Sequence, residues 1–100
     1  MAKLPRMSLQ TMKVLDSLLG HPASSGADVS RLTGLASGTL YPILLRLEEA
    51  GWLSSRWESG DPASLGRPRK RYYSVTAEGQ RGYNATVRQF TASHLGVAFS

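Results

Sequence analysis

The strongest hydrophobic pattern in the chain lies between residues 37 and 52. Its apolar positions recur at helical spacing and share one side of a helix. They are Leu40, Ile43, Leu44 and Leu47. Gly51 follows them, where glycine most easily adopts the left-handed conformation that ends a helix. The opposite side carries groups that can contact a polar polymer: Gly38, Thr39, Tyr41, Pro42, Leu45 and Arg46. The pattern predicts a helix over residues 37–50 with one buried side and one exposed side.

Two shorter helices are predicted before this one. Ser8 is placed to cap a helix that runs to Leu19 and closes at Gly20. Ser25 and Asp28 have the spacing of a capping box, which begins a second helix that stops at Gly34. Residues 26–50 therefore indicate a helix-turn-helix, and residues 1–7 a short N-terminal arm.

The apolar arc of the first helix is wide. It contains Met12, Val14, Leu15, Leu18 and Leu19. A helix packed on one neighbour needs a stripe of only about 100°. The extra width predicts a second packing partner for this helix.

After residue 51 the period changes to two, which is typical of strands. Residues 52–58 and 71–75 predict a hairpin, and the second strand can place Tyr73 and Val75 against the core. The connecting stretch SGDPASLGRPRK is rich in glycine and proline and is expected to be irregular. The aromatic residues Trp52, Trp57, Tyr72 and Tyr73 could form a stacking platform for single strands, but alternating burial in a hairpin explains them more simply.

Thr76 can cap a last helix, with Glu78 favourably placed in its first turn. An apolar stripe then recurs at alternating spacings of four and three: Tyr83, Val87, Phe90 and His94. A stripe under two heptads long cannot hold a coiled coil by itself, so this helix must lie against something. Joining it to the wide arc of the first helix across two subunits would cover both surfaces, which predicts a homodimer.

Composition bounds the remaining possibilities. One hundred residues form one small domain, and the absence of cysteine excludes disulfides and thiolate metal sites. The longest apolar runs are far shorter than a membrane span and no signal peptide is evident, so a cytoplasmic protein is expected. With two distant histidines and no glycine-rich phosphate motif, no catalytic constellation can be assembled, and no enzyme activity, cofactor or metal is predicted.

The net charge of +5 is concentrated late in the chain, at Arg67, Arg69, Lys70 and Arg71. Such a run alone is commonly a solvated loop. In a hairpin that directly follows a helix-turn-helix, phosphate binding is the favoured interpretation. The alternative is a winged-helix module that binds a protein and has no specific DNA contacts, and the apolar Leu45 would favour it.

Two blocks of sequence, LYPILLRLEEAGWL at residues 40–53 and GRPRKRYYSVTAEG at residues 66–79, resemble the PadR family of bacterial transcriptional regulators. The single last helix is similar to the shorter branch of that family. The resemblance implies a homodimer joined through the last and first helices. It places Thr39, Tyr41 and Arg46 in a recognition helix and Arg69 and Lys70 in the wing. Leu45 departs from the polar or basic residue often found there, and the last helix has no tryptophan for an aromatic drug pocket. A small-molecule effector is possible but not indicated.

The sequence thus predicts a mainly α fold with a small β-hairpin, a winged helix-turn-helix over residues 8–75 and a dimerisation helix over residues 76–100. The expected function is a dimeric regulator, usually a repressor, that reads palindromic double-stranded DNA with two recognition helices about 34 Å apart. The candidate DNA contacts are Ser37, Thr39, Tyr41, Pro42, Arg46, Arg67, Arg69, Lys70 and Arg71. The candidate dimer contacts are Met12, Leu15, Leu19, Tyr83, Val87, Phe90 and His94.

Overall fold

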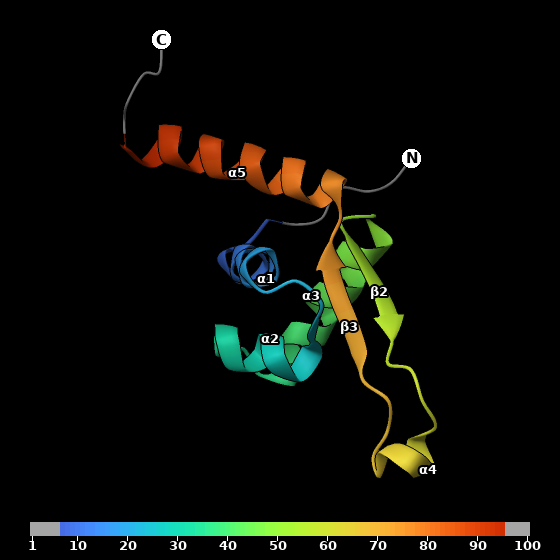
Figure 1. The fold of residues 1–100 in the computed structure, drawn as a ribbon. Helices are drawn as coiled ribbons and strands as arrows, with labels where there is room; N and C mark the ends of the chain where they lie inside the picture. Colours follow the sequence, from blue (N-terminus) through green and yellow to red (C-terminus); the bar gives the residue numbers. More distant parts are fainter. Residues whose placement is uncertain (1–6, 96–100) are drawn as a thin grey trace.

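A computed structural model describes residues 7–95, with side chains through residue 91. Within this range the chain is mostly helical and carries a three-stranded antiparallel sheet, in the order of a winged helix (Figure 1). The predicted fold class is therefore confirmed. The predicted arm lies outside the described residues except for Met7, which packs on the core. Residues 96–100 and the side chain of His94 also lie outside them.

The first two helices begin as their capping residues predict, but the first one includes Gly20 and ends one residue later than expected, with His21 as its C-cap. Helix α1 (Leu9–Gly20) is capped by Ser8, whose Oγ accepts the Thr11 N–H at 3.1 Å. Helix α2 (Gly26–Thr33) begins with the predicted capping box: Ser25 Oγ accepts the Asp28 N–H, and the Asp28 carboxylate accepts the Ser25 N–H. These hydrogen bonds hold the pKa of Asp28 below its ordinary value. The helix stops at Gly34, which is left-handed with φ +77°.

Helix α3 (Ser37–Glu49) follows across a short turn, and its predicted leucine and isoleucine stripe is buried. The stripe packs with residues from α1, α2 and the sheet to form the core. That core comprises Val14, Leu15, Leu18, Val29, Leu40, Ile43, Leu44, Leu47, Ala50, Trp52, Leu53 and Tyr73. The direction of α3, and hence the direction of its exposed side, is set by this packing.

The sheet contains the predicted hairpin and one strand that was not predicted. Strands β2 (Leu53–Trp57) and β3 (Arg71–Val75) pair in the register Leu53 with Val75 and Trp57 with Arg71. Strand β1 (Ser24–Ser25) adds to the other edge of β3, opposite Tyr73 and Tyr72. Two residues are too few to show a period of two, so the sequence pattern could not indicate β1.

The segment between β2 and β3 was expected to be irregular, and this prediction is wrong for four of its residues. It contains a one-turn helix, α4 (Pro62–Leu65), at the tip of the hairpin. Asp61 caps it by accepting the Ala63 N–H, Pro62 occupies its first turn, and Gly66 ends it with φ +71°. Each of these residue types favours a helix end, so the local signals were present.

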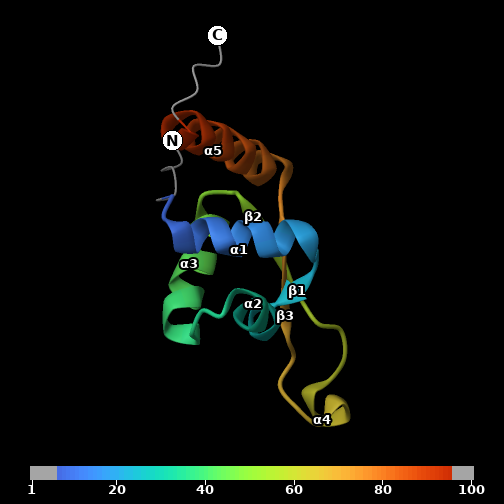
Figure 2. The ribbon, with the colours of Figure 1, turned by 90° about the vertical axis from the view of Figure 1, so that its left-hand side faces the viewer.

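The alternating burial predicted for the hairpin fails at Trp57. Leu53 is buried, but Trp57, on the same side of β2, is 59% exposed. The hairpin projects past the helices and carries α4 at its tip (Figure 2). Trp57 is not among the core residues and borders a surface hollow with Tyr41 instead. Only the inner half of the strand therefore follows the pattern of a strand packed on one face.

Helix α5 (Ala77–Leu95) crosses the end of the molecule opposite α4 (Figure 1). Thr76 Oγ1 accepts the Gly79 N–H, as expected of a cap. Gly79 and Gly82 lie so close to Trp52 that neither leaves room for a Cβ atom. The Tyr83 hydroxyl donates to the Asp16 carboxylate at 3.0 Å, and burial followed by this hydrogen bond raises the pKa of Tyr83.

Two parts of the dimer argument need correction. The wide arc of α1 has partners within its own chain, because α1 packs against α2, α3, β3 and α5. Leu15 is 0% exposed in this core, so it offers no surface to a second subunit. Tyr83 likewise packs within its own chain, against the core and Asp16. The α1 arc therefore gives no evidence of its own for a dimer.

Candidate nucleic-acid interface

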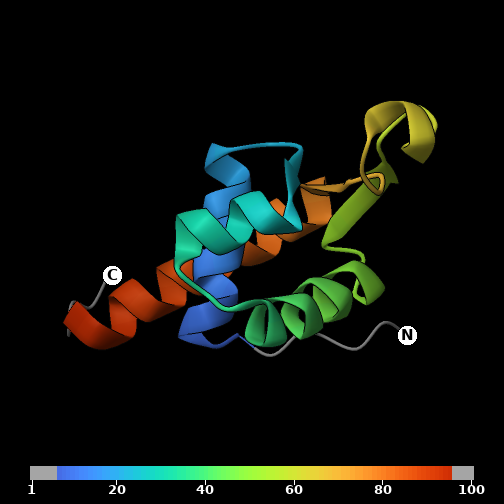
Figure 3. The same cartoon turned by 90° about the horizontal axis from the view of Figure 1, so that it is seen from below.

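Seen from the side opposite α5, helices α2 and α3 and the tip of the hairpin lie nearest the viewer (Figure 3). We call residues 58–70, which connect β2 to β3, the wing. The exposed side of α3 and the wing thus share one face of the molecule. This arrangement follows from the buried stripe of α3, which forces its polar side outward, and from the pairing of β2 with β3.

Most of the candidate α3 residues are accessible on this face. Ser37, Pro42 and Arg46 are exposed, Tyr41 is 48% exposed, and Thr39 is half-buried. Leu45 is 59% exposed, so an apolar side chain stands among them. The first turn of α3 has no side-chain cap, and the Thr39 and Leu40 amides donate to the Ala36 carbonyl.

Tyr41 packs against α2 while keeping contact with solvent. Its ring and hydroxyl lie over Gly26, so closely that no Cβ would fit there. Together they border a hollow of about 370 Å³ between α2, α3 and the wing. The hollow is lined by Ser25, Gly26, Ala27, Tyr41, Trp57, Arg69, Lys70, Arg71 and Tyr73. The fold thereby brings Tyr41 together with the basic end of the wing.

The other α3 candidates lie elsewhere on the same helix. Thr39, Pro42 and Arg46 line a second hollow, formed with the start of α1. Helix α3 therefore presents two separate groups of candidate residues, one beside the wing and one beside α1.

The four basic residues of the cluster do not share one role. Arg67 forms a bidentate pair with Glu58, at 2.6 Å and 2.9 Å. This pairing raises the pKa of Arg67, with the Glu58 hydrogen bond as the largest cause. Arg71 pairs with Glu48 of α3 at 3.1 Å and donates to Ser55 at 2.8 Å. Both cations are thus already paired within the chain.

Arg71 also lies over two aromatic rings, those of Trp57 and Tyr73, at 5.4 Å and 5.8 Å from their centroids. Its side chain links the outer end of the hairpin, where β3 begins, to Glu48 of α3. Arg71 is therefore already engaged within the chain, and its contact with phosphate stays a prediction.

Arg69 and Lys70 differ from these two residues. Both are exposed, and neither side chain has a hydrogen bond or ion pair within residues 7–91. Arg46 on α3 is in the same situation. Arg69 and Lys70, unpaired among residues 7–91, stand beside Tyr41 and form a surface suited to a polyanion. Arg46 lies apart from them, beside the start of α1.

Sequence reasoning missed three contributors to this surface. Trp57 was expected to follow a pattern of alternating burial, yet it borders the hollow beside Arg69. The start of α2 lines the same hollow, and only the packing of Tyr41 on Gly26 reveals it. Glu58 fell within the predicted strand over residues 52–58, yet its carboxylate accepts hydrogen bonds from Arg67, Lys70 and Tyr72. No sequence signal distinguishes it from other acidic surface residues.

Among residues 7–91, whose side chains are described, no group of three or more histidine, aspartate and glutamate side chains could hold a metal ion. No helix within residues 7–95 is long and apolar enough to cross a membrane. The described features are those of a winged helix-turn-helix with a basic wing, a class of DNA-binding domain.

The family can be named more closely. Residues 27–85 match the model of the transcriptional regulator PadR-like family, so the chain belongs to that family. The resemblance seen in the sequence is thereby confirmed. Members of this family are transcription regulators rather than enzymes, and this chain is one of them.

Solved structures agree with this assignment. A PadR family transcriptional regulator from Eggerthella lenta is 27% identical to this chain, with a TM-score of 0.73. The match covers 86% of this chain and 75% of the Eggerthella lenta chain. The protein smu.1704 from Streptococcus mutans is 26% identical with a TM-score of 0.68, covering 92% and 86% of the two chains. BpsR of Bordetella bronchiseptica, whose DNA binding is regulated by 6-hydroxynicotinic acid, is 25% identical with a TM-score of 0.68. The match covers 93% of this chain and 64% of BpsR. No curated protein sequence matches the chain.

Proposed function

We propose that this regulator is a homodimeric repressor that binds a palindromic operator. One α3 helix of each subunit would enter the major groove, and the two grooves would lie about 34 Å apart on one side of the duplex. The observation that carries the proposal is the shared face of α3 and the wing, where Tyr41 stands beside Arg69 and Lys70. Repression would follow from occupation of a site that polymerase needs.

Phosphate contacts and base contacts fall to different residues in this proposal. Arg69 and Lys70 neutralise phosphates of the backbone, which supplies affinity but little choice of sequence. Ser37, Thr39, Pro42 and Arg46 follow the groove along the exposed side of α3. Tyr41 reaches a base edge or the adjacent backbone, and Leu45 can meet a thymine methyl group.

The decisive experiment compares salt dependence in two double variants. Replacing Arg69 and Lys70 by alanine should weaken binding to every duplex and lower the slope of log K against log salt by about 2 per subunit engaged. Replacing Arg81 and Arg88, two exposed arginines of α5, by alanine removes the same charge far from the wing and serves as control. An equal change of slope in both double variants would show that only net charge matters, and the wing assignment would be wrong.

Sequence reading by α3 has a separate test. Tyr41→Ala should reduce binding to a selected operator more than binding to random duplex, because only base contacts carry sequence information. Selection of sites from random duplexes supplies the operator. Equal losses on both kinds of DNA would reduce Tyr41 to a positioning contact.

The homodimer is proposed to form through α5. The C-terminal part of this helix extends past the other elements in two perpendicular views (Figures 1 and 3). Exposed apolar side chains occur on α5 and at the start of α1: Leu9, Val87 and Phe90. Burying a side chain of this kind stabilises an interface by roughly 1.5 to 3 kcal/mol. Met12 and Leu19, which are half-buried, can contribute at its margin.

The dimer is tested by introducing an aspartate at either of two neighbouring positions of α5. Phe90→Asp should yield monomers in sedimentation at micromolar concentration, because a carboxylate cannot be buried cheaply without a partner. Gln89→Asp, at an adjacent exposed position, should leave the dimer intact. A wild-type monomer that binds a single half-site tightly would refute the dimeric model.

A further inference from the structure

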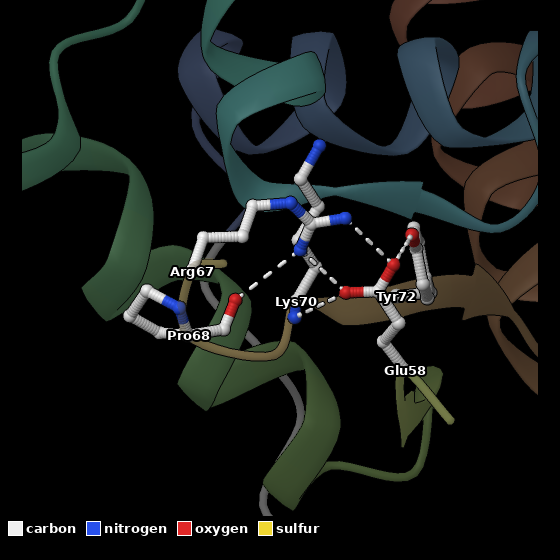
Figure 4. A network of polar contacts seen from close by, with 5 residues as sticks. All are labelled: Glu58, Arg67, Pro68, Lys70 and Tyr72. Atoms are coloured by element: carbon white, nitrogen blue, oxygen red, sulfur yellow. Dashed lines mark hydrogen bonds and ion pairs between the residues drawn. The ribbon is translucent and has the colours of Figure 1, made fainter. Parts of the chain in front are cut away.

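The carboxylate of Glu58 receives four hydrogen bonds at the neck of the wing (Figure 4). Arg67 Nη1 and Nη2 donate to its two oxygens at 2.6 Å and 2.9 Å, and the Lys70 backbone N–H donates at 3.1 Å. The Tyr72 hydroxyl donates at 3.3 Å. Through one side chain, both ends of the loop are therefore held together.

The position of Glu58 in the chain gives these contacts their effect. The paired ladder of β2 and β3 ends at Trp57 and Arg71, and Glu58 and Lys70 come next on the two strands. Their backbones are joined by the Glu58 N–H, which donates to the Lys70 carbonyl at 2.7 Å. The side chain extends this closure to Arg67, which also donates to the Pro68 carbonyl at 3.2 Å. The backbone on both sides of Arg69 is thus tied to Glu58.

The charge state of Glu58 suits this role. Hydrogen bonds from Arg67 and then from the Lys70 backbone lower the pKa of its carboxyl to about 2. The side chain is consequently a carboxylate throughout the physiological range, and it accepts all four hydrogen bonds at once.

We infer that Glu58 is a positioning residue for DNA binding: by closing the neck of the wing through Arg67 and Lys70, it presents the Arg69 and Lys70 side chains toward the hollow beside Tyr41. The inference rests on the proposed function. In it, Arg67 serves the shape of the wing rather than a phosphate, and the two following cations make the contacts.

This role predicts an effect opposite in sign to that of simple electrostatics. A carboxylate near DNA repels phosphate, so its removal should strengthen binding if only charge matters. If the carboxylate orders the wing, its removal should weaken binding, because two long side chains must then be ordered at the moment of association.

The first experiment measures DNA affinity and its salt slope for Glu58→Gln and Glu49→Gln. Glu49 is an exposed residue at the end of α3 whose side chain has no partner within residues 7–91, so both variants gain the same charge. We expect Glu58→Gln to bind on the order of tenfold more weakly, with a slope lower by roughly 1 to 2. Glu49→Gln should bind as tightly as wild type or slightly more tightly. A Glu58→Gln chain that binds as well as Glu49→Gln overturns the inference.

A charge-neutral variant sharpens the comparison. Glu58→Gln combined with Arg67→Gln keeps the net charge at +5, since one negative and one positive charge are lost together. We expect it to bind about as weakly as Glu58→Gln alone, because both partners serve one contact. Wild-type affinity in the double variant would overturn the inference.

A second measurement does not involve DNA. Hydrogen exchange at the Lys70 amide, which donates to Glu58, should accelerate in Glu58→Gln, while the amide of Tyr73 in the core of the sheet should not change. Unchanged exchange at Lys70 overturns the inference even if DNA affinity falls. If the wild-type chain binds no duplex, the proposed function fails, and the exchange result still decides whether Glu58 orders the wing.

Discussion

Gly82→Ala provides a sharp test of how α5 is attached to the domain. A helix interior normally prefers alanine to glycine by about 1 kcal/mol, so propensity alone predicts that this change stabilises the protein. The structure predicts the reverse. A Cβ atom on Gly82 would overlap three atoms of the Trp52 indole ring, well inside van der Waals contact.

The magnitude follows from what can move. Trp52 is buried, and its ring is rigid, so it cannot withdraw in the way that the tip of a flexible side chain could. The alternative is for α5 to shift outward as a whole. One turn earlier, Gly79 lies just as close to Trp52, since a Cβ atom there would overlap the Trp52 carbonyl oxygen. Overpacking a core by one carbon typically costs 1–3 kcal/mol. After the propensity gain is subtracted, we expect a net loss of about 1 to 2 kcal/mol.

Chemical denaturation at one fixed protein concentration measures this loss. The midpoint should fall with an unchanged m-value, which indicates lower stability rather than a different unfolded state. Gly38→Ala in α3 is the matched control, because nothing lies within 4 Å of a Cβ built there. It should be neutral or stabilising by less than about 1 kcal/mol. If Gly82→Ala is as stable as Gly38→Ala, the close packing of α5 on Trp52 is incorrect.

Two further predictions concern polar groups. Ser25→Ala removes half of the capping box of α2 and should lower the free energy of unfolding by about 1 kcal/mol, whereas Ser59→Ala in the exposed wing should leave it unchanged. Because the pKa of Glu58 falls from 4.5 to about 2 on folding, its contribution to wing stability is complete above pH 4.5 and is lost as the pH falls toward 2. Carbon NMR should therefore show that the Glu58 carboxyl titrates with a pKa of about 2. A titration midpoint near pH 4.5 would contradict the hydrogen bonds that the carboxylate accepts.

Much of the candidate interface could be predicted because it depends on one periodic helix. The buried stripe of α3 determines which side is exposed, and so Tyr41 and Arg46 could be assigned to the surface from spacing alone. Which of the four basic residues at positions 67 to 71 are paired within the chain could not be predicted. Whether Arg67, Arg71, Arg69 or Lys70 is paired depends on acidic residues that lie 9 to 23 positions away, as in Arg67 with Glu58 and Arg71 with Glu48.

The sequence by itself determined the local structure: the caps at Ser8 and Ser25, the left-handed stop at Gly34, and the order of the four long helices and the two hairpin strands. These features depend on hydrogen bonds and backbone preferences within a few residues, which the sequence records directly. Only the tertiary structure decided that β1 pairs with β3, that Trp57 lies beyond the core and that Gly82 must be a glycine. Each of these depends on the distance between segments remote in the chain, which the burial of the whole core sets and no local pattern encodes.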